Sequence, residues 1–156
     1  MDQFSLPTLA EAIFLLPMTV LTIFACIPIT IKVFSKNQEP ANLLTLGFSV
    51  VGILLAAVLT IYQGKAPPQT VFSGALIFDR MAIYVNLGVL AITLFTLFLS
   101  INNVNTKGNS FAEHTFLILL SAVGMLTLTS SGDLMVAFIG LEIMSCLLYT
   151  SPSPRD

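Results

Sequence analysis

The sequence predicts an all-α polytopic membrane protein with about five transmembrane helices. Its composition and its long runs without charged residues carry this prediction. Hydrophobic residues make up 56% of the 156 residues and charged residues only 9%, whereas a soluble domain carries roughly 25% charged residues. So few charges cannot cover the surface of a water-soluble fold of this length. With six Lys and Arg scattered along the chain and a net charge of −2, no basic patch for a nucleic acid is expected.

The charge-free runs define the expected helices. Because a helix rises 1.5 Å per residue, about 20 apolar residues cross the ~30 Å hydrocarbon core of a bilayer. The runs predict helices over residues 8–33, 42–62, 79–101, 112–130 and 133–149. The first four are long enough to cross. The last apolar run, residues 134–149, extends only about 24 Å and is too short.

Polar segments separate the expected helices. A turn is predicted over residues 35–40, longer connections over 63–80 and 102–109, and a tight turn over 130–133. Ser131 or Asp133 is expected to cap the last helix, so residues 112–149 form a helical hairpin. Two prolines, Pro17 and Pro28, fall inside the first helix. Membrane helices tolerate proline when neighbours satisfy the carbonyl groups that it frees.

Lysine and arginine residues predict the orientation. With the N-terminus outside, the inner connections carry Lys32, Lys36 and Lys107, and the outer ones carry Lys65 and Arg80. Three against two favours this orientation by the positive-inside rule. The first ten residues contain no Lys or Arg, so we expect no cleavable signal peptide.

Most polar candidates have a structural interpretation. Cys26 and Cys146 lie in separate apolar runs without a neighbouring Cys or His, which favours small hydrophobic side chains over a disulfide or a metal site. No glycine pattern of a dinucleotide or phosphate loop is present. The remaining candidates are expected at helix ends or at the membrane boundary: Glu11, Asp79 with Arg80, Glu113 with His114, and Asp133.

Glu142 is the candidate residue for proton transfer. It lies eight residues beyond Leu134, about 12 Å along the helix and thus near the middle of the hydrocarbon layer. An ionised acid there costs on the order of 2.5–3.5 kcal/mol. Glu142 is therefore expected to face a protein interior or a hydrated cavity, or to stay protonated. Its helix face is expected to include Met135, Phe138, Ile139, Ser145 and Cys146.

Several segments resemble subunit N of respiratory complex I, the proton-translocating NADH:quinone oxidoreductase. The resemblance extends from about residue 6 to residue 149 and is most specific in the predicted hairpin. It is carried by residues 113–125, by Gly132-Asp133-Leu134, by Phe78-Asp79-Arg80-Met81-Ala82 and, above all, by Gly140-Leu141-Glu142-Ile143-Met144-Ser145.

The resemblance implies a truncated part of a larger helical bundle with two inverted repeats. In that family the glutamate matching Glu142 pairs with a lysine on the seventh helix, and this pair couples quinone reduction to proton translocation. The subunit itself is expected to bind no cofactor, whereas the complex uses NADH, FMN, iron–sulfur clusters and quinone. The implied partners are other membrane subunits and the lipid bilayer. The implied location is the inner membrane of a bacterial cell.

Three interpretations stay open at this point. The first is an N-terminal segment of subunit N over residues 1–149, followed at 150–156 by a tail whose two closely spaced prolines cannot finish a membrane helix. We expect this tail to be non-native. The second is a subunit of a multi-subunit cation/proton antiporter. The third is a five-helix membrane protein or truncated fragment without transport activity.

Overall fold

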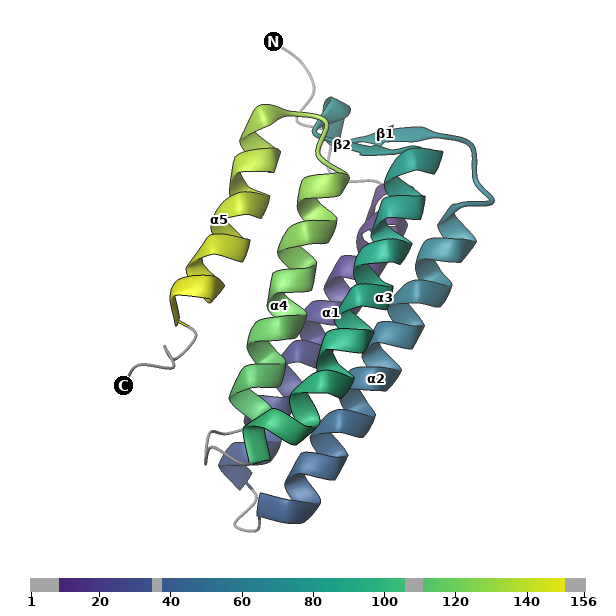
Figure 1. Ribbon diagram of the computed structural model, residues 1–156. Coiled ribbons are helices and arrows are strands. Elements are labelled where there is room, and N and C mark those ends of the chain that lie inside the picture. Colours follow the sequence, from purple (N-terminus) through teal and green to yellow (C-terminus); the bar gives the residue numbers. More distant parts are fainter. Residues whose placement is uncertain (1–8, 35–37, 106–110, 151–156) are drawn as a thin grey trace.

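Five helices make up nearly all of the described chain. The computed structural model describes residues 9–34, 38–105 and 111–150. The helices are α1 (Leu9–Phe34), α2 (Gln38–Gln63), α3 (Arg80–Asn105), α4 (Phe111–Thr129) and α5 (Leu134–Thr150) (Figure 1). These bounds confirm an all-α membrane fold, and each of the five expected helices is present.

Helices α1 to α4 pack side by side as a bundle, and α5 lies outside it against α4 (Figure 1). The core of the bundle is apolar, with Leu21 of α1, Ile53 of α2, Leu97 of α3 and Leu119 of α4 at most 2% exposed. Each of the four helices therefore buries one stripe and leaves the rest of its surface outside the bundle.

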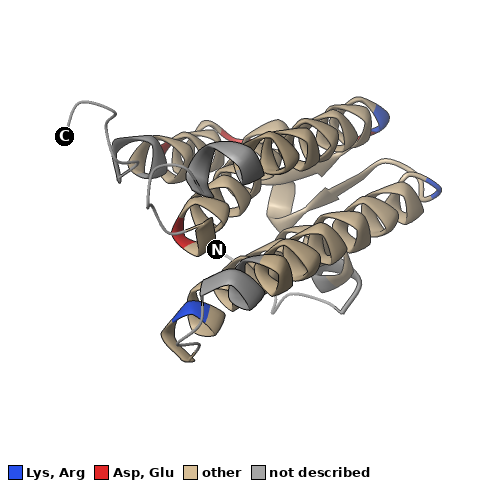
Figure 2. Ribbon diagram, turned by 60° about the horizontal axis from the view of Figure 1, so that its bottom comes forward, with Lys and Arg blue, Asp and Glu red and all other residues tan. Residues whose placement is uncertain are grey.

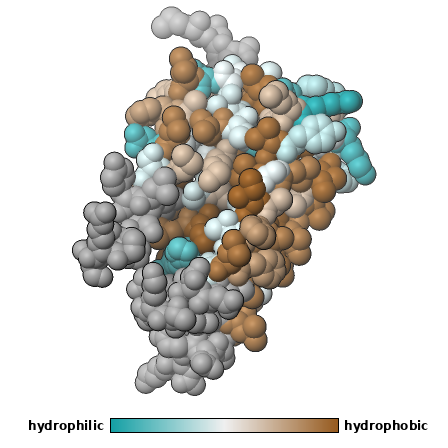
Figure 3. All heavy atoms as spheres, in the orientation of Figure 1, coloured by the Kyte–Doolittle hydropathy of each residue, from teal (hydrophilic) through white to brown (hydrophobic). Residues whose placement is uncertain are grey.

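The outer surface of the bundle is suited to lipid. Four helices are long and apolar enough to cross a membrane, whereas the described apolar part of α5, Leu134–Cys146, is shorter. Large apolar side chains cover the outside of the helices (Figure 3). The basic residues that the structure describes lie at helix ends or just beyond them (Figure 2): Lys32 in the last turn of α1, Lys65 two residues after α2 and Arg80 at the start of α3. The prediction of four helices long enough to cross a membrane and one shorter helix is confirmed for the described residues.

The carbonyl group that Pro17 leaves without a donor in α1 is bonded by a side chain of another helix. Pro17 has no N–H group, so the carbonyl of Ile13 four residues earlier loses its helical donor. The buried side chain of Gln63 on α2 donates from Nε2 to the carbonyl oxygens of Ile13 and Phe14, both at 3.1 Å. A neighbouring helix thus satisfies the carbonyl that Pro17 frees, as expected for a membrane helix. The sequence had placed Gln63 in a loop.

A β-hairpin caps one end of the bundle, where only a loop was expected. Strand β1 (Gln69–Val71) pairs antiparallel with β2 (Leu76–Phe78), and the short 3₁₀ turn η1 (Phe72–Gly74) connects them. Gly74 has a φ of 97°, a conformation that glycine adopts readily. Val71, Leu76 and Phe78 are buried against Phe14, whose ring centroid lies 5.4 Å from that of Phe78. The hairpin is therefore packed onto α1.

Three helix ends differ from the expectation. Helix α2 begins at Gln38, so Pro40 lies in its first turn, where the missing N–H has no intrahelical acceptor in any case. Helix α3 continues to Asn105, because a helix can extend beyond the apolar run into the polar boundary. Ser131 does not cap α5, because its hydroxyl donates back to the carbonyl of Leu128 in α4 at 2.7 Å. Of the expected tail over residues 150–156, Thr150 is the last residue of α5, and residues 151–156 lie outside the described residues.

Candidate functional site

Glu142 lies midway along α5. The helix begins at Leu134, with Asp133 at its N-cap position, where the Asp133 carbonyl accepts a hydrogen bond from Ala137 N–H at 3.0 Å. Glu142 follows eight residues later, about 12 Å along the helix axis. Its depth relative to the end of the bundle is therefore the one that the sequence predicted.

The face of α5 that carries Glu142 points away from the other four helices. Glu142 is exposed, and Met135, Phe138 and Ile139 on the same face are 72%, 61% and 47% exposed. Ser145 is half-buried, and Cys146 is exposed. The predicted members of this face are correct, but among the described residues no other helix covers it. The protein interior expected around Glu142 is thus not formed by this part of the chain.

The opposite face of α5 packs closely on α4 through two glycines. A Cβ atom added to Gly140 would lie 2.9 Å from the Leu128 backbone nitrogen and 3.0 Å from the Gly124 carbonyl oxygen. A Cβ atom added to Gly124 would lie 3.1 Å from the Gly140 carbonyl oxygen and from the Met144 nitrogen. Small residues allow membrane helices to approach this closely. Because Gly140 precedes Glu142 by two residues, this contact directs the carboxyl group outward.

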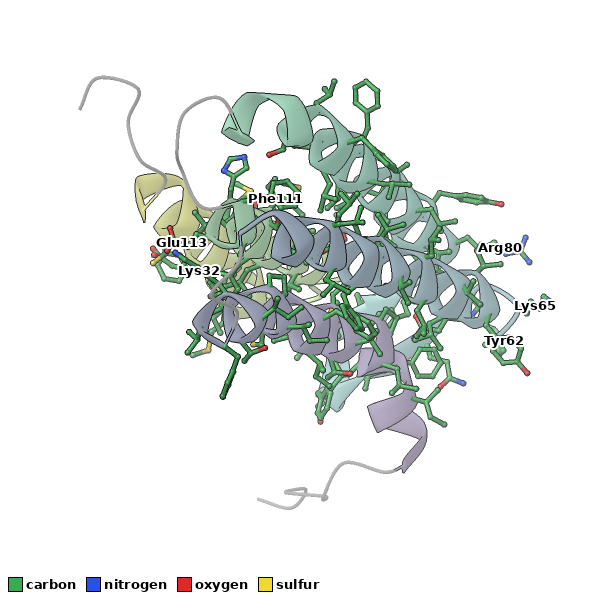
Figure 4. All side chains as sticks on the ribbon, turned by 90° about the horizontal axis from the view of Figure 1, so that it is seen from below. Lys32, Tyr62, Lys65, Arg80, Phe111 and Glu113 are labelled. Atoms are coloured by element: carbon green, nitrogen blue, oxygen red, sulfur yellow. The ribbon has the colours of Figure 1, made fainter. Side chains whose placement is uncertain are left out.

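An ion pair joins α1 and α4 at the other end of the bundle. Lys32 donates to the carboxylate of Glu113, and their side chains are 36% and 62% exposed (Figure 4). His114 beside Glu113 is half-buried. This agrees with the boundary position predicted for Glu113 and His114. The sequence did not indicate that Lys32 is the partner of Glu113.

The other acidic candidates are structural where the structure describes them. Asp79 caps α3, because its Oδ1 accepts a hydrogen bond from the Ala82 N–H at 2.7 Å. Arg80 is the first residue of that helix and lies at the same end of the bundle as Lys65, whose ammonium is 5.9 Å from the Tyr62 ring centroid (Figure 4). Glu11 lies in the first turn of α1, and its side chain is outside the described residues.

Metal-binding groups do not cluster in the part of the chain that the structure describes. No three His, Cys, Asp or Glu side chains there are arranged to hold an ion. Cys26 and Cys146 are both free thiols and belong to α1 and α5. Among the described residues, the candidate group for proton transfer is therefore the carboxyl group of Glu142, which lies within an apolar helix.

Sequence reasoning missed the residues that hold Glu142 in place. Gly124 and Gly140 stood out only as members of segments that carry the resemblance and not as packing residues, although a glycine inside a membrane helix is itself a signal of close helix contact. Asn86 was likewise visible as a polar side chain within an apolar run.

Comparison with known proteins identifies one group of relatives. No family model matches the chain. The chain is 39% identical to NADH-quinone oxidoreductase subunit N of Bdellovibrio bacteriovorus over 141 residues, which are 90% of this chain and 29% of that protein. It is 30% identical to subunit N of Rhodobacter capsulatus over 148 residues, 95% of this chain and 30% of that protein. It is also 30% identical to subunit N of Rhodospirillum rubrum over 136 residues, 86% of this chain and 27% of that protein.

The names of the relatives favour subunit N over a cation/proton antiporter. All three carry the name of subunit N, and none is named as a cation/proton antiporter. The chain spans about 30% of the length of the curated relatives that it matches. Over this span, the chain belongs to the family of subunit N of NADH-quinone oxidoreductase.

Proposed function

We propose that this chain is part of a membrane subunit through which NADH:quinone oxidoreductase couples electron transfer to proton translocation, with Glu142 as a proton-accepting group. The observation that carries the proposal is the place of Glu142. It is an acid about 12 Å into an apolar helix, on a face that no described helix covers. Intramembrane acids are costly and serve ion or proton pathways by default.

The chemistry follows from the surroundings of the carboxyl group. In an apolar environment the neutral acid is favoured, whereas a cation close to the group favours the carboxylate. In this proposal, a positively charged lysine that approaches Glu142 promotes the release of the proton from the Glu142 carboxyl group. When the lysine withdraws, the carboxyl group takes up a proton again. No described basic residue forms an ion pair with Glu142. The uncovered face of α5 is where a later helix of the full-length subunit would bring this cation.

Electron transfer belongs to other subunits in this proposal. The described residues hold no cluster of metal ligands and the two cysteines stand on separate helices, so they do not form a site for an iron–sulfur cluster. NADH, FMN, iron–sulfur clusters and quinone are bound elsewhere in the complex.

The partners of this chain are other membrane subunits and the lipid around α1 to α4. The location is the bacterial inner membrane.

Replacement of Glu142 in the full-length subunit tests the proposal. Glu142→Gln keeps the size and hydrogen-bonding capacity but removes the titratable group. It should leave the complex assembled and lower coupled proton translocation, by roughly tenfold or more if proton transfer through Glu142 is obligatory. Glu142→Asp keeps a titratable carboxyl group and should lower proton translocation less than Glu142→Gln does. The matched control is Glu113→Gln, which removes a carboxylate at the boundary and should leave translocation unchanged.

Two measurements are needed, because other membrane subunits of the same complex can compensate for a substitution in this one. The number of protons moved per electron should be measured together with the rate of quinone reduction. A Gln variant with normal assembly, rate and stoichiometry would refute the assignment. Loss of assembly in both the Gln and the Asp variants would instead give Glu142 a structural role, since losing a partner from a buried hydrogen bond costs stability.

A further inference from the structure

The turn between α4 and α5 is held by a buried side chain of α3. Asn86 is only 4% exposed and Ser130 is fully buried. Asn86 Nδ2 donates to the Ser130 hydroxyl at 3.2 Å, and Asn86 Oδ1 accepts a hydrogen bond from the Thr129 hydroxyl. Both sides of one amide are thus satisfied by the last residue of α4 and the first residue of the turn. A buried amide with both groups paired fixes the position of its partners.

The hairpin holds the same turn from its outer side. Ile77 N–H donates to the Ser130 carbonyl at 2.8 Å, and Gly132 N–H donates to the Ala75 carbonyl at 2.9 Å. Leu76 of β2 and Ser131 of the turn pair as an isolated antiparallel bridge, so the turn lies beside β2 (Figure 1). Gly132 has no room for a side chain. A Cβ atom there would collide with the Gly74 carbonyl and lie 2.7 Å from Ile77 Cγ1.

These contacts fix one end of α5, and the glycine contact fixes its middle. Helix α5 begins two residues after Gly132, and Gly140 is in close contact with Gly124 and Leu128. A helix fixed at two points along its length has a defined rotation and depth. Along the rest of its length α5 packs on α4, and no other helix of the described bundle makes an extensive contact with it. Residues of α3 and of the hairpin are therefore connected to Glu142 through the start of its own helix.

We propose that Asn86 and Gly132 are positioning residues for Glu142: they hold the α4–α5 turn on α3 and on the hairpin and thereby set the rotation and depth of α5. This inference rests on the proposed function of Glu142. Neither residue takes part in proton transfer. Asn86→Leu removes the two hydrogen bonds that the Asn86 side chain makes with Thr129 and Ser130. Gly132→Ala displaces the turn from the hairpin. The two variants therefore disturb the turn from opposite sides.

Distances between spin labels in the full-length subunit test whether Asn86 and Gly132 hold α5 in place. Labels at Tyr84 on α3 and at Leu141 on α5, outside the face that carries Glu142, occupy exposed sites, in a background without other reactive cysteines. Asn86→Leu and Gly132→Ala should each broaden the distance distribution between the labels. Thr93→Val and Gly88→Ala are the matched controls on α3. The Thr93 hydroxyl bonds only its own helix at Val89, and a Cβ atom at Gly88 would meet nothing within 4 Å. Both should leave the distribution unchanged.

Proton translocation in the assembled complex tests the functional half. Asn86→Leu should lower the number of protons moved per electron while the complex stays assembled. In a Glu142→Gln background the same change should cause no further loss, because two residues that act through one group are not additive. If Asn86→Leu only destabilised the subunit, less complex would assemble, and the loss of proton translocation would add to that caused by Glu142→Gln. Gly132→Ala provides the second variant where Asn86→Leu fails to assemble.

The outcomes separate the two proposals. Unchanged distances in both variants overturn the claim that these residues hold α5. Broadened distances with normal stoichiometry, while Glu142→Gln lowers it, overturn the positioning role and leave the proposed function standing. If Glu142→Gln has no effect, the proposed function fails and the functional half of this inference with it. The distance measurement still decides whether Asn86 and Gly132 hold the helix.

Discussion

At the scale of single residues, a proline and a glutamine on different helices form one unit. Pro17 frees the Ile13 carbonyl, and Gln63 Nε2 donates to it. Gln63→Leu should therefore destabilise the folded subunit by about 1–3 kcal/mol, because a buried carbonyl loses its donor. In a Pro17→Ala background the restored N–H can bond Ile13 within α1, so Gln63→Leu should cost less. The free energy of unfolding in detergent for the four variants measures this difference. An equal cost in both backgrounds would show that the two residues are independent.

The ion pair between Lys32 and Glu113 should contribute little to stability. Both side chains are more than a third exposed, and exposed pairs contribute roughly 0–1 kcal/mol. A double-mutant cycle with Lys32→Gln and Glu113→Gln should give a coupling energy within that range. The coupling should weaken as salt is added, because surface charges are screened. A coupling of several kcal/mol that is insensitive to salt would contradict this interpretation of the pair as a solvated contact at the membrane boundary.

At the scale of helices, the close contact of α4 with α5 depends on glycine. Gly140→Ala places a Cβ atom 2.9–3.0 Å from backbone atoms of Leu128 and Gly124, and backbone cannot give way as a flexible side chain can. Overpacking of this kind costs typically about 1–3 kcal/mol. Gly88→Ala has open space and should be neutral or stabilise α3 by up to about 1 kcal/mol. Detergent unfolding of both variants checks this. Equal stability of the two would mean that α5 does not need the close approach.

The helices were predictable because apolar runs and chain breaks are local properties of the sequence. Each helix end falls within a few residues of its prediction, with Pro40 tolerated in a first turn. The hairpin was not predicted, because its strands have three residues each and gain order from packing on Phe14. The face of Glu142 was predicted from helical spacing. What covers this face could not be predicted, since that depends on contacts between helices distant in sequence.

At the scale of the whole molecule, the described charges define two ends. The Lys32–Glu113 pair places the end of α1 and the start of α4 together at one end. Lys65 and Arg80 mark the other end, beside the hairpin (Figure 4). Helix α5 starts at this second end, because its turn is bonded to the hairpin. The orientation of Glu142 and of its helix is therefore fixed once the side of either end is known.

The positive-inside rule predicts that the Lys32 end of the bundle faces the cytoplasm. Lys36 follows α1 and Lys107 precedes α4 in the sequence, in connections outside the described residues. The rule therefore counts three lysines for this side, against Lys65 and Arg80 for the other. Fluorescent-protein fusions, which are bright only inside the cell, should be bright after residue 36 or 107 and dark after residue 65. Alkaline phosphatase fusions, active only outside, should give the opposite pattern. Phosphatase activity at residues 36 and 107 would reverse the orientation, and with it the side of the membrane from which α5 carries Glu142 inward.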